Sequence, residues 1–378
     1  MSTAGRRNSN NSFSMQSNLQ HVAGIVALTT TGVLGMIGMF APLLVPCDSS
    51  ILSTKATRKM IHKRRMARPR EQSEAKVGKP HHHPGGENFL LAQEQNWNQS
   101  NTGIEREHFN YIQNCVRLSA QEEENNIGGK CRRRFLNVGG CVALTLQFLR
   151  HAPRPSELAR IHGLSKTVVH RTIEWTLLHM RTSLDTIKTP QPKEVPPPLG
   201  RFNSNGSIDC CTHPRDRVHP GQDEYYRGDK MCHFLTSQVV VDHLGYIIRL
   251  SIGKGHNNDQ GMFQLTNMLE WLQKSGLGHL LADGGYSGDG TVRPMGAQDL
   301  MLNGNNSALL ASNAQHSGER VLVENINSFF KGWHFASAKC KLSVELQAVA
   351  LMVCGQLACL THKPNPTARS RILNANQH

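Results

Sequence analysis

The segment Leu280-Leu-Ala-Asp-Gly-Gly-Tyr286 places a carboxylate directly after an apolar run, and two glycines and an aromatic residue follow it. The run predicts a strand over residues 278–282, so that Asp283 lies at the C-terminal tip of this strand, where the chain must turn. Gly284 and Gly285 permit the turn and let a bulky partner approach the backbone. Taken alone, the segment is more typical of a surface turn than of a functional site. The residues upstream and downstream of it favour the functional interpretation.

Three more strands are expected upstream, at residues 207–211, 234–241 and 246–252. The first carries Asp209 in its middle. The second is rich in β-branched residues, and the turn after it predicts that the second and third strands form a hairpin. A helix that begins at Gly255-His-Asn-Asn-Asp259 and runs to about Lys274 then leads to the fourth strand. This order predicts an α/β sheet with Asp209 and Asp283 on adjacent strands.

A helix over residues 320–331 can supply a third carboxylate. Arg320, Glu324 and Lys331 are separated by four and seven residues, so they share one face of this helix. The segment also offers apolar residues for packing, namely Leu322, Ile326, Phe329, Phe330 and Trp333. The helix could therefore dock on the sheet and direct Glu324 toward the two aspartates, with its basic neighbours binding phosphate. The alternative is a surface helix with an Arg–Glu pair within it.

Three converging carboxylates suit a site for divalent metal ions, because Mg²⁺ and Mn²⁺ both prefer hard oxygen ligands. Two such ions can activate a water or a 3′-hydroxyl and stabilise the leaving oxygen of an in-line displacement at phosphorus. Without metal, three clustered acids would repel one another and would also repel DNA. The pattern therefore favours metal-dependent phosphoryl transfer.

The composition agrees with a polyanionic partner. The chain has 378 residues, enough for two domains with tails, and a net charge of +14. This charge favours nucleic acid over an anionic membrane as the partner. None of the ten cysteines lies in a CxxC pair, which excludes a zinc-finger spacing and indicates reduced thiols in an intracellular protein.

Residues 1–102 read as a low-complexity basic tail with one hydrophobic segment. Residues 22–46 contain no charged residue and are long enough to cross a bilayer, but threonines and glycines keep their hydrophobicity modest. A membrane anchor, a targeting segment and a gene-model artefact all remain open for them, and a membrane partner is not expected. Residues 55–70 carry eight Lys and Arg and no acid, which fits a nuclear import signal, a phosphate-binding arm or a solvated tail.

A helical region is expected over residues 103–188. Phe109, Ile112 and Val116 form one apolar stripe, and the polar, acidic run 121–126 together with Gly128-Gly129 should break that helix. Residues 135–149 give a second apolar helix. Five prolines between Thr189 and Pro198 then mark the clearest domain boundary, with a linker over 189–205, a domain over 206–362 and a tail over 363–378.

Residues 155–175 carry the spacing of a helix-turn-helix. Ser156 should be the N-cap of the first helix with Glu157 as an acid in its first turn, Gly163 should take the sharp turn, and Ser165 should cap the second helix. Small and apolar residues at Ala159 and Val169 fit the close packing of the two helices. The second helix should expose four residues suited to phosphate or base-edge contact, namely Lys166, Thr167, His170 and Arg171. Many helical hairpins share this spacing without touching DNA.

Residues 206–362 resemble the DDE-type transposases of the Harbinger superfamily, which have a ribonuclease-H-like catalytic core. The motifs that carry the resemblance are Ile208-Asp209, Tyr225-Tyr-Arg-Gly-Asp-Lys230, Gln238-Val-Val-Val-Asp242 with Gly245, Gly255-His-Asn-Asn-Asp259, Ala282-Asp-Gly-Gly-Tyr286 and the run from Arg320 to Lys331. The region from Arg134 to Leu184 looks like the family's N-terminal helical region. The implied fold is a mixed sheet flanked by helices, preceded by the helix-turn-helix region and the basic tail.

The resemblance implies that Asp209, Asp283 and Glu324 are the catalytic, metal-binding acids, with Mg²⁺ or Mn²⁺ as cofactor. Asp259 lies in a family motif and would either cap the following helix or join the metal ligands. Arg320 and Lys331 would contact the active site or the DNA backbone.

The implied protein is a nuclear DNA endonuclease and transposase, a hydrolase acting on phosphodiester bonds. Its partners would be transposon ends, target DNA and a Myb-like accessory protein, and a homo-oligomer is left open.

The sequence also departs from the family pattern. Asp209-Cys-Cys-Thr212 stands where the family commonly has Asp-Gly-Thr, and Ser-Gly-Asp-Gly follows Tyr286 in place of the usual proline. A decayed or domesticated relative that binds DNA without cutting it is therefore the main alternative. A membrane-anchored protein built on the same domain is the third interpretation.

Overall fold

The computed structural model describes residues 102–126, 136–195, 198, 201–302 and 307–362, which all belong to one compact unit. The hydrophobic segment 22–46, the basic run 55–70 and the tail 363–378 lie outside the described residues. The predictions made for them stay predictions.

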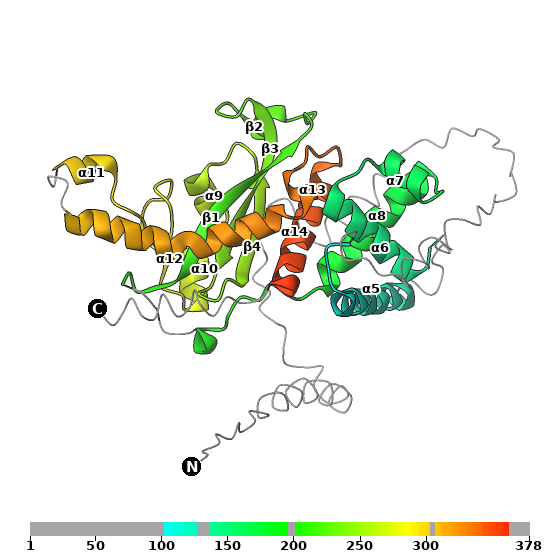
Figure 1. The fold of residues 1–378 in the computed structure, drawn as a ribbon, viewed down its shortest axis with the longest axis horizontal. Coiled ribbons are helices and arrows are strands. Elements are labelled where there is room, and N and C mark those ends of the chain that lie inside the picture. The colour runs from blue at the N-terminus through cyan, green and yellow to red at the C-terminus, as the bar shows by residue number, and fades with distance from the viewer. Residues whose placement is uncertain (1–101, 127–135, 196–197, 199–200, 303–306, 363–378) are drawn as a thin grey trace, which may run out of the picture. The chain divides into compact units, whose positions relative to one another are not determined.

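A six-stranded mixed sheet forms the centre of the second half of the chain (Figure 1). Its strands are β1 (Ser204–Arg215), β2 (Tyr226–Arg227), β3 (Cys232–Val241), β4 (Ile247–Lys254), β5 (His279–Leu281) and β6 (Thr291–Val292). β3 pairs with β4, β2 and β1, all antiparallel, and so confirms the predicted hairpin. On its other edge β1 pairs with β5 and β5 with β6, both parallel.

Helices cover both faces of this sheet, which explains why the strands β3 and β4 are buried along most of their length. The covering helices are α9 (Asp259–Leu265), α10 (Met268–Ser275), α12 (Ser307–Lys331), α13 (His334–Ser337) and α14 (Val344–Thr361). The short helix α11 (Ala297–Leu302) lies apart from the sheet, near the start of α12 (Figure 1). Alternate side chains of β3 enter different cores. Val240 packs with residues of α9 and α10, whereas Val239 and Val241 pack with residues of α12 and α14.

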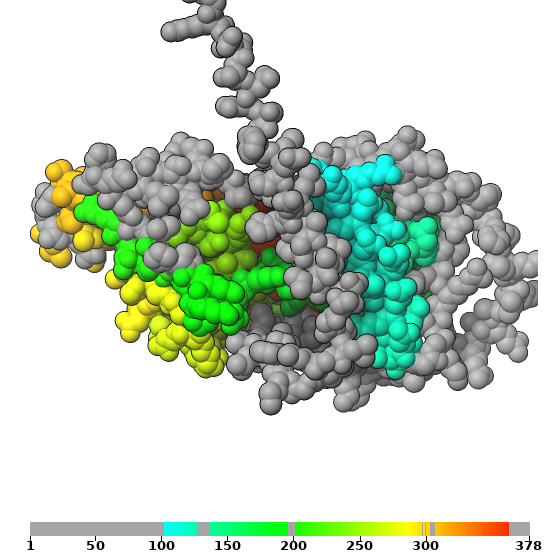
Figure 2. All heavy atoms as spheres, turned by 90° about the horizontal axis from the view of Figure 1, so that it is seen from below, coloured from blue at the N-terminus to red at the C-terminus, as the bar shows by residue number. Residues whose placement is uncertain are grey.

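A helical region precedes the sheet. It contains α5 (Arg106–Asn126), α6 (Val138–His151), α7 (Pro155–Ile161) and α8 (Lys166–Ser183). The predicted stripe of Phe109, Ile112 and Val116 is buried, while the outer side of α5, cyan in Figure 2, lies on the surface.

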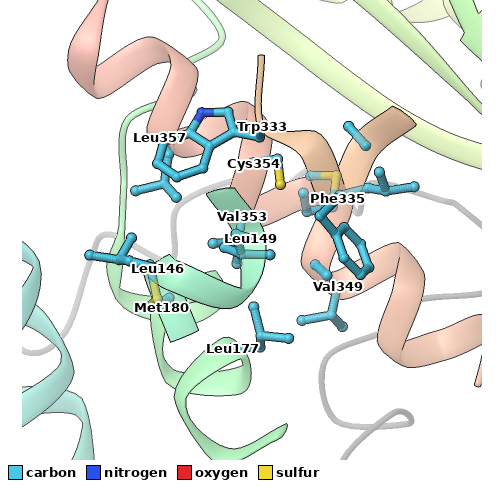
Figure 3. Close-up of a cluster of buried hydrophobic side chains, with 14 of the residues drawn as sticks. Leu146, Leu149, Leu177, Met180, Trp333, Phe335, Val349, Val353, Cys354 and Leu357 are labelled. Carbon is cyan, nitrogen blue, oxygen red and sulfur yellow. The ribbon is translucent and has the colours of Figure 1, made fainter. Parts of the chain in front are cut away.

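The helical region and the sheet region share one hydrophobic core. Figure 3 shows Leu146 and Leu149 of α6 and Leu177 and Met180 of α8 around Val353, Cys354 and Leu357 of α14, close to Trp333 and Phe335. The regions before and after the proline-rich segment therefore bury apolar surface against each other and contribute to the same core.

The same packing explains α14. It is the one described helix that is long and apolar enough to cross a membrane by length and composition, and 78% of it is buried inside the protein.

The predicted turn between two helices is present at residues 162–165. Gly163 has a φ of +62°, and the Ser165 side chain accepts a hydrogen bond from the backbone N–H of Val168, so both predictions are confirmed. The prediction for Ser156 was wrong, because Arg154 is the N-cap and makes no side-chain cap bond. Pro155 fixes the first turn instead, since its ring presets a helical φ.

Gly128-Gly129, also predicted to break α5, lie outside the described residues, whereas the polar, acidic run 121–126 does not break this helix, which continues to Asn126. The reason is a contact with α8. Glu123 Oε2 lies 3.0 Å from His179 Nε2, and Ser119 Oγ lies 2.9 Å from His179 Nδ1. This pairing gives the polar end of α5 a partner in the tertiary structure that its own sequence does not reveal.

The strand order and directions, with helices on both faces, fit the ribonuclease-H-like fold that the family resemblance implied. The antiparallel half of the sheet comes first in the chain, and the parallel strands β5 and β6 follow after α9 and α10. One detail differs from the prediction. A left-handed Asn267, with φ of +46°, divides the expected helix over residues 255–274 into α9 and α10.

Candidate active site

The parallel pairing of β1 with β5 brings two of the predicted acids to one end of the sheet. Ser207 is paired with Leu281, and Asp209 and Asp283 each follow two residues later. Since parallel strands run in the same direction, both carboxylates lie at the same level beside each other. The turn after β5 is anchored by Tyr286, which is fully buried with its hydroxyl 3.3 Å from the Cys210 thiol of β1.

Asp209 is largely buried and is contacted from α12. The side-chain amide of Asn327 donates a hydrogen bond of 2.8 Å to Asp209 Oδ2, and Arg320 Nη1 lies 3.9 Å from Oδ1. Burial raises the pKa of Asp209 to about 6. The Arg320 charge lowers that pKa in part, and the charges of Asp283 and Asp259 raise it. Asp209 therefore sits in a site whose surroundings oppose its negative charge.

Asp259 lies beside Asp283 and does not cap α9. The cap is Asn258, whose side-chain oxygen accepts a 2.8 Å hydrogen bond from the backbone N–H of Gly261. Both aspartates border Gly285: a Cβ placed there would lie 2.6 Å from Asp259 Oδ2 and 3.1 Å from Asp283 Oδ1. Burial and the Asp283 charge raise the pKa of the Asp259 carboxyl. The capping alternative for Asp259 was wrong, and the residue belongs with the acids of the site.

Glu324 does not join these acids in this structure. Its carboxylate pairs with Arg320 one turn earlier on α12, and its side chain is 47% exposed. The Arg–Glu pair expected in the alternative interpretation of this helix is thus present. Among the residues that the structure describes, no group of three or more His, Cys, Asp or Glu side chains is arranged to hold a metal ion.

The donor chemistry of the site nevertheless fits a hard divalent cation. Asp209, Asp259 and Asp283 interact through their charges, and carboxylate oxygens are the preferred ligands of Mg²⁺ and Mn²⁺. Next to Asp209, the Oδ1 of Asn327 is buried and has no hydrogen-bond partner. Asn327 was missed in the sequence, although it lies seven residues after Arg320 and four before Lys331, on the helix face already identified.

Positive charge lies along β1 beyond Asp209. Lys331 is close enough to Cys211 to oppose, by hydrogen bonding and charge, the rise that burial causes in the pKa of that thiol. Lys230 Nζ donates a 2.9 Å hydrogen bond to Thr212 Oγ1. Lys230 appeared in a sequence motif but was not predicted as a site residue, because its approach to β1 depends on the sheet. These two ammonium groups suit a phosphate next to the acids.

The residues predicted for DNA contact fall into two places. Arg320 and Lys331 are on α12 at the site. Lys166, Thr167, His170 and Arg171 are all exposed on the N-terminal half of α8, a helix that packs against α5, α6, α7 and α14. The exposed face predicted for the second helix is therefore present, and its DNA contact stays a prediction.

Residues 208–361 match the family model described as DDE superfamily endonuclease. The matched segment begins next to Asp209, ends with α14, and includes Asp259, Asp283 and Glu324. No curated protein and no solved structure matches the chain. The match supports a DDE transposase family and a nuclease-type enzyme, for which DNA is the substrate and divalent metal ions are the usual cofactors.

Proposed function

We propose that this chain, which carries a DDE superfamily endonuclease domain over residues 208–361, is a transposase of the Harbinger type. It cuts and joins DNA at the ends of its own transposable element. The observation that supports this best is the register of β1 and β5, which sets Asp209 and Asp283 side by side, with α12 packed against β1 and carrying Glu324.

In the proposed enzyme, Asp209 and Asp283 would hold the divalent metal ions and Glu324 would complete the ligand set, with Asp259 as a further carboxylate. When bound, such ions would activate a water or a 3′-hydroxyl of the DNA and neutralise charge on the phosphate. Lys230 and Lys331 hold the DNA phosphate beside the acids, because both ammonium groups lie along β1. The side chains of the site thereby fix the phosphodiester in line for attack.

Arg320 has two roles in this proposal. With no DNA bound, its guanidinium balances Glu324 and lies near Asp209. A Glu324 carboxylate that turned from Arg320 toward Asp209 would leave the guanidinium free for a DNA phosphate. An arginine suits this exchange, since its planar donors bind carboxylate and phosphate with similar geometry.

DNA recognition is shared in this proposal. The exposed residues of α8 contact DNA, and a Myb-like accessory protein supplies further sequence specificity, as the family resemblance implies. The enzyme works in the nucleus, where its substrate is, and assembly into a homo-oligomer would bring two element ends together.

Two observations favour a second candidate function, a decayed relative that binds DNA without cutting it. Glu324 is paired with Arg320 rather than with the aspartates, and Cys210 and Cys211 stand where the family commonly has Gly-Thr. In that case α8 would still bind DNA, and the acids would have no catalytic role.

Cleavage of a DNA duplex bearing the element's own ends tests the proposal. The intact protein, Asp283→Asn and the control Asp289→Asn are compared with Mg²⁺ or Mn²⁺, with and without the Myb-like partner. Asp289 is an exposed carboxylate in the same loop between β5 and β6, so its change controls for charge. Metal-dependent cutting that only Asp283→Asn abolishes is the expected result. DNA binding without cutting by any of the three proteins, partner included, would instead support the decayed relative.

A further inference from the structure

We propose that Asn327 is a positioning residue of the active site, which orients the Asp209 carboxylate for metal binding. This inference rests on the proposed function, because it assigns Asp209 a metal ion. It concerns a residue other than the proposed catalytic acids, Asp209, Asp283 and Glu324, and the basic residues near them.

The contact is direct and buried. Asn327 Nδ2 donates a 2.8 Å hydrogen bond to Asp209 Oδ2, and the two residues are 118 positions apart in the chain. Asn327 is only 7% exposed. Its neighbours on the same face of α12, Val323 and Phe330, are fully buried apolar residues. Burying an amide among them is unfavourable unless it is hydrogen bonded, so packing alone does not explain an asparagine at this position.

The amide fixes one oxygen of Asp209 and leaves the other for a ligand. Asn327 donates its hydrogen bond to Oδ2 of Asp209, while Arg320, two turns earlier on the same helix, lies near Oδ1 of that carboxylate. Arg320 is a cation and competes with a metal ion for the carboxylate charge. Asn327 is neutral and does not compete, since a carboxylate accepts several hydrogen bonds and keeps its charge. Asn327 can therefore hold Asp209 in the same orientation with and without metal.

The other end of the Asn327 amide carries an open acceptor. Its Oδ1 is buried and has no hydrogen-bond partner, although buried polar atoms of native proteins are generally paired. A buried acceptor of this kind suits an ordered water molecule, which commonly pairs with buried polar atoms.

Direct Mn²⁺ binding in the absence of DNA tests the inference. The full chain is compared with Asn327→Leu, which keeps a similar side-chain volume and removes the donor, and with Asn327→Ala. Asn325→Leu is the matched control, because Asn325 is an exposed asparagine on the same helix. Free Mn²⁺ is measured by electron paramagnetic resonance, and thermal unfolding without metal checks the fold.

The expected result is a Kd for Mn²⁺ that rises about 10- to 100-fold in both Asn327 variants, as is typical when a residue that orients a metal ligand is lost. Asn325→Leu should leave the Kd unchanged, and Asn327→Leu should unfold at a temperature no lower than that of the intact protein. Unchanged Mn²⁺ binding in Asn327→Leu, or in Asn327→Ala if the leucine variant does not fold, would overturn the inference.

The same experiment separates this inference from the proposed function. One outcome is that the intact protein binds Mn²⁺ and fails to cut DNA, while the Asn327 variants bind Mn²⁺ more weakly. In that case Asn327 is a positioning residue in a protein that is not an active transposase. If the intact protein binds no Mn²⁺ at all, both proposals fail.

Discussion

The helical region and the sheet region place their charged residues in opposite ways. On α8, the four residues predicted to contact DNA are all exposed and extend from the first half of one helix. In the sheet region, Asp209 is largely buried, and its carboxylate oxygens face Asn327 and Arg320 of α12, a helix far from β1 in the sequence. Both regions nevertheless share one hydrophobic core.

This difference decides how each set of residues can act. An exposed charge remains hydrated, so it costs little to keep and acts through long-range attraction that salt weakens. A buried carboxylate loses hydration and depends on its hydrogen-bond partners and nearby charges. Substitutions of the buried acids in the sheet region should therefore change activity and stability strongly, whereas substitutions of the four exposed residues of α8 should change DNA affinity alone.

The largest effect is expected for Glu324→Gln. If Glu324 completes the ligand set, its loss should cost several kcal/mol of transition-state stabilisation, on the order of 10³-fold in the rate of metal-dependent DNA cleavage. Glu270→Gln is the matched control, because Glu270 forms the same kind of pair with Lys274 four residues away, on an exposed helix surface. A Glu324→Gln variant that cuts at the normal rate would show that Glu324 is only a surface partner of Arg320.

The second prediction concerns the shared core. Leu149→Ala should destabilise the protein by about 2 to 5 kcal/mol, because Leu149 is fully buried between α6 and α14. Hydrogen exchange should rise in both α8 and β3, since the two regions unfold together. Leu118→Ala, at an exposed leucine of α5, should have little effect. Faster exchange in α8 alone would show that the sheet region is stable independently.

A third prediction follows from the pKa of Asp209, which is raised from 3.8 to about 6 by burial. The folded state binds this proton more tightly than the unfolded state, so stability falls as the pH rises from about 4 to about 6 and then stays lower. The Asp209→Asn variant has no carboxyl to ionise at this position, so it does not lose this stability as the pH rises. In metal-free buffer, urea unfolding should show the variant more stable than the intact protein by about 2 to 3 kcal/mol at pH 7.5. Equal stabilities at pH 7.5 would contradict the prediction.

The smallest effect is expected on α8. Lys166→Ala and Arg171→Ala should each weaken DNA binding, and each should reduce the slope of log affinity against log salt by about 1 if the residue contacts a phosphate. Stability should not change, because both side chains are exposed. Lys188→Ala is the control, since Lys188 is exposed beyond the end of α8 and pairs with Asp185. An unchanged salt slope in both variants would place the DNA contact elsewhere.

Local patterns predicted most of the elements. Asp209 in the middle of a strand, the hairpin of β3 and β4, and the cap at Ser165 depend on residues close together in the chain. The helical spacing of Arg320, Glu324 and Lys331 is local in the same way. One error occurred where a contact from elsewhere decided the outcome, because His179 of α8 pairs with the polar end of α5. Two others were errors of position within a local pattern: Asn258 rather than Asp259 caps α9, and α7 begins at Pro155 with Arg154 as its N-cap.

The sequence by itself therefore determined the kinds of elements, the acids on β1 and after β5, and the polar face of α12, because these follow from periodicity and turn chemistry. Only the tertiary structure decided which side chains meet. It kept Glu324 apart from the aspartates, brought Asn327 to Asp209, set Asp259 beside Asp283, and joined the helical region to the sheet in one core. The physical reason is that these contacts join residues by burial and charge in three dimensions, and a periodic pattern states which face of a helix or strand a residue occupies but not what that face meets.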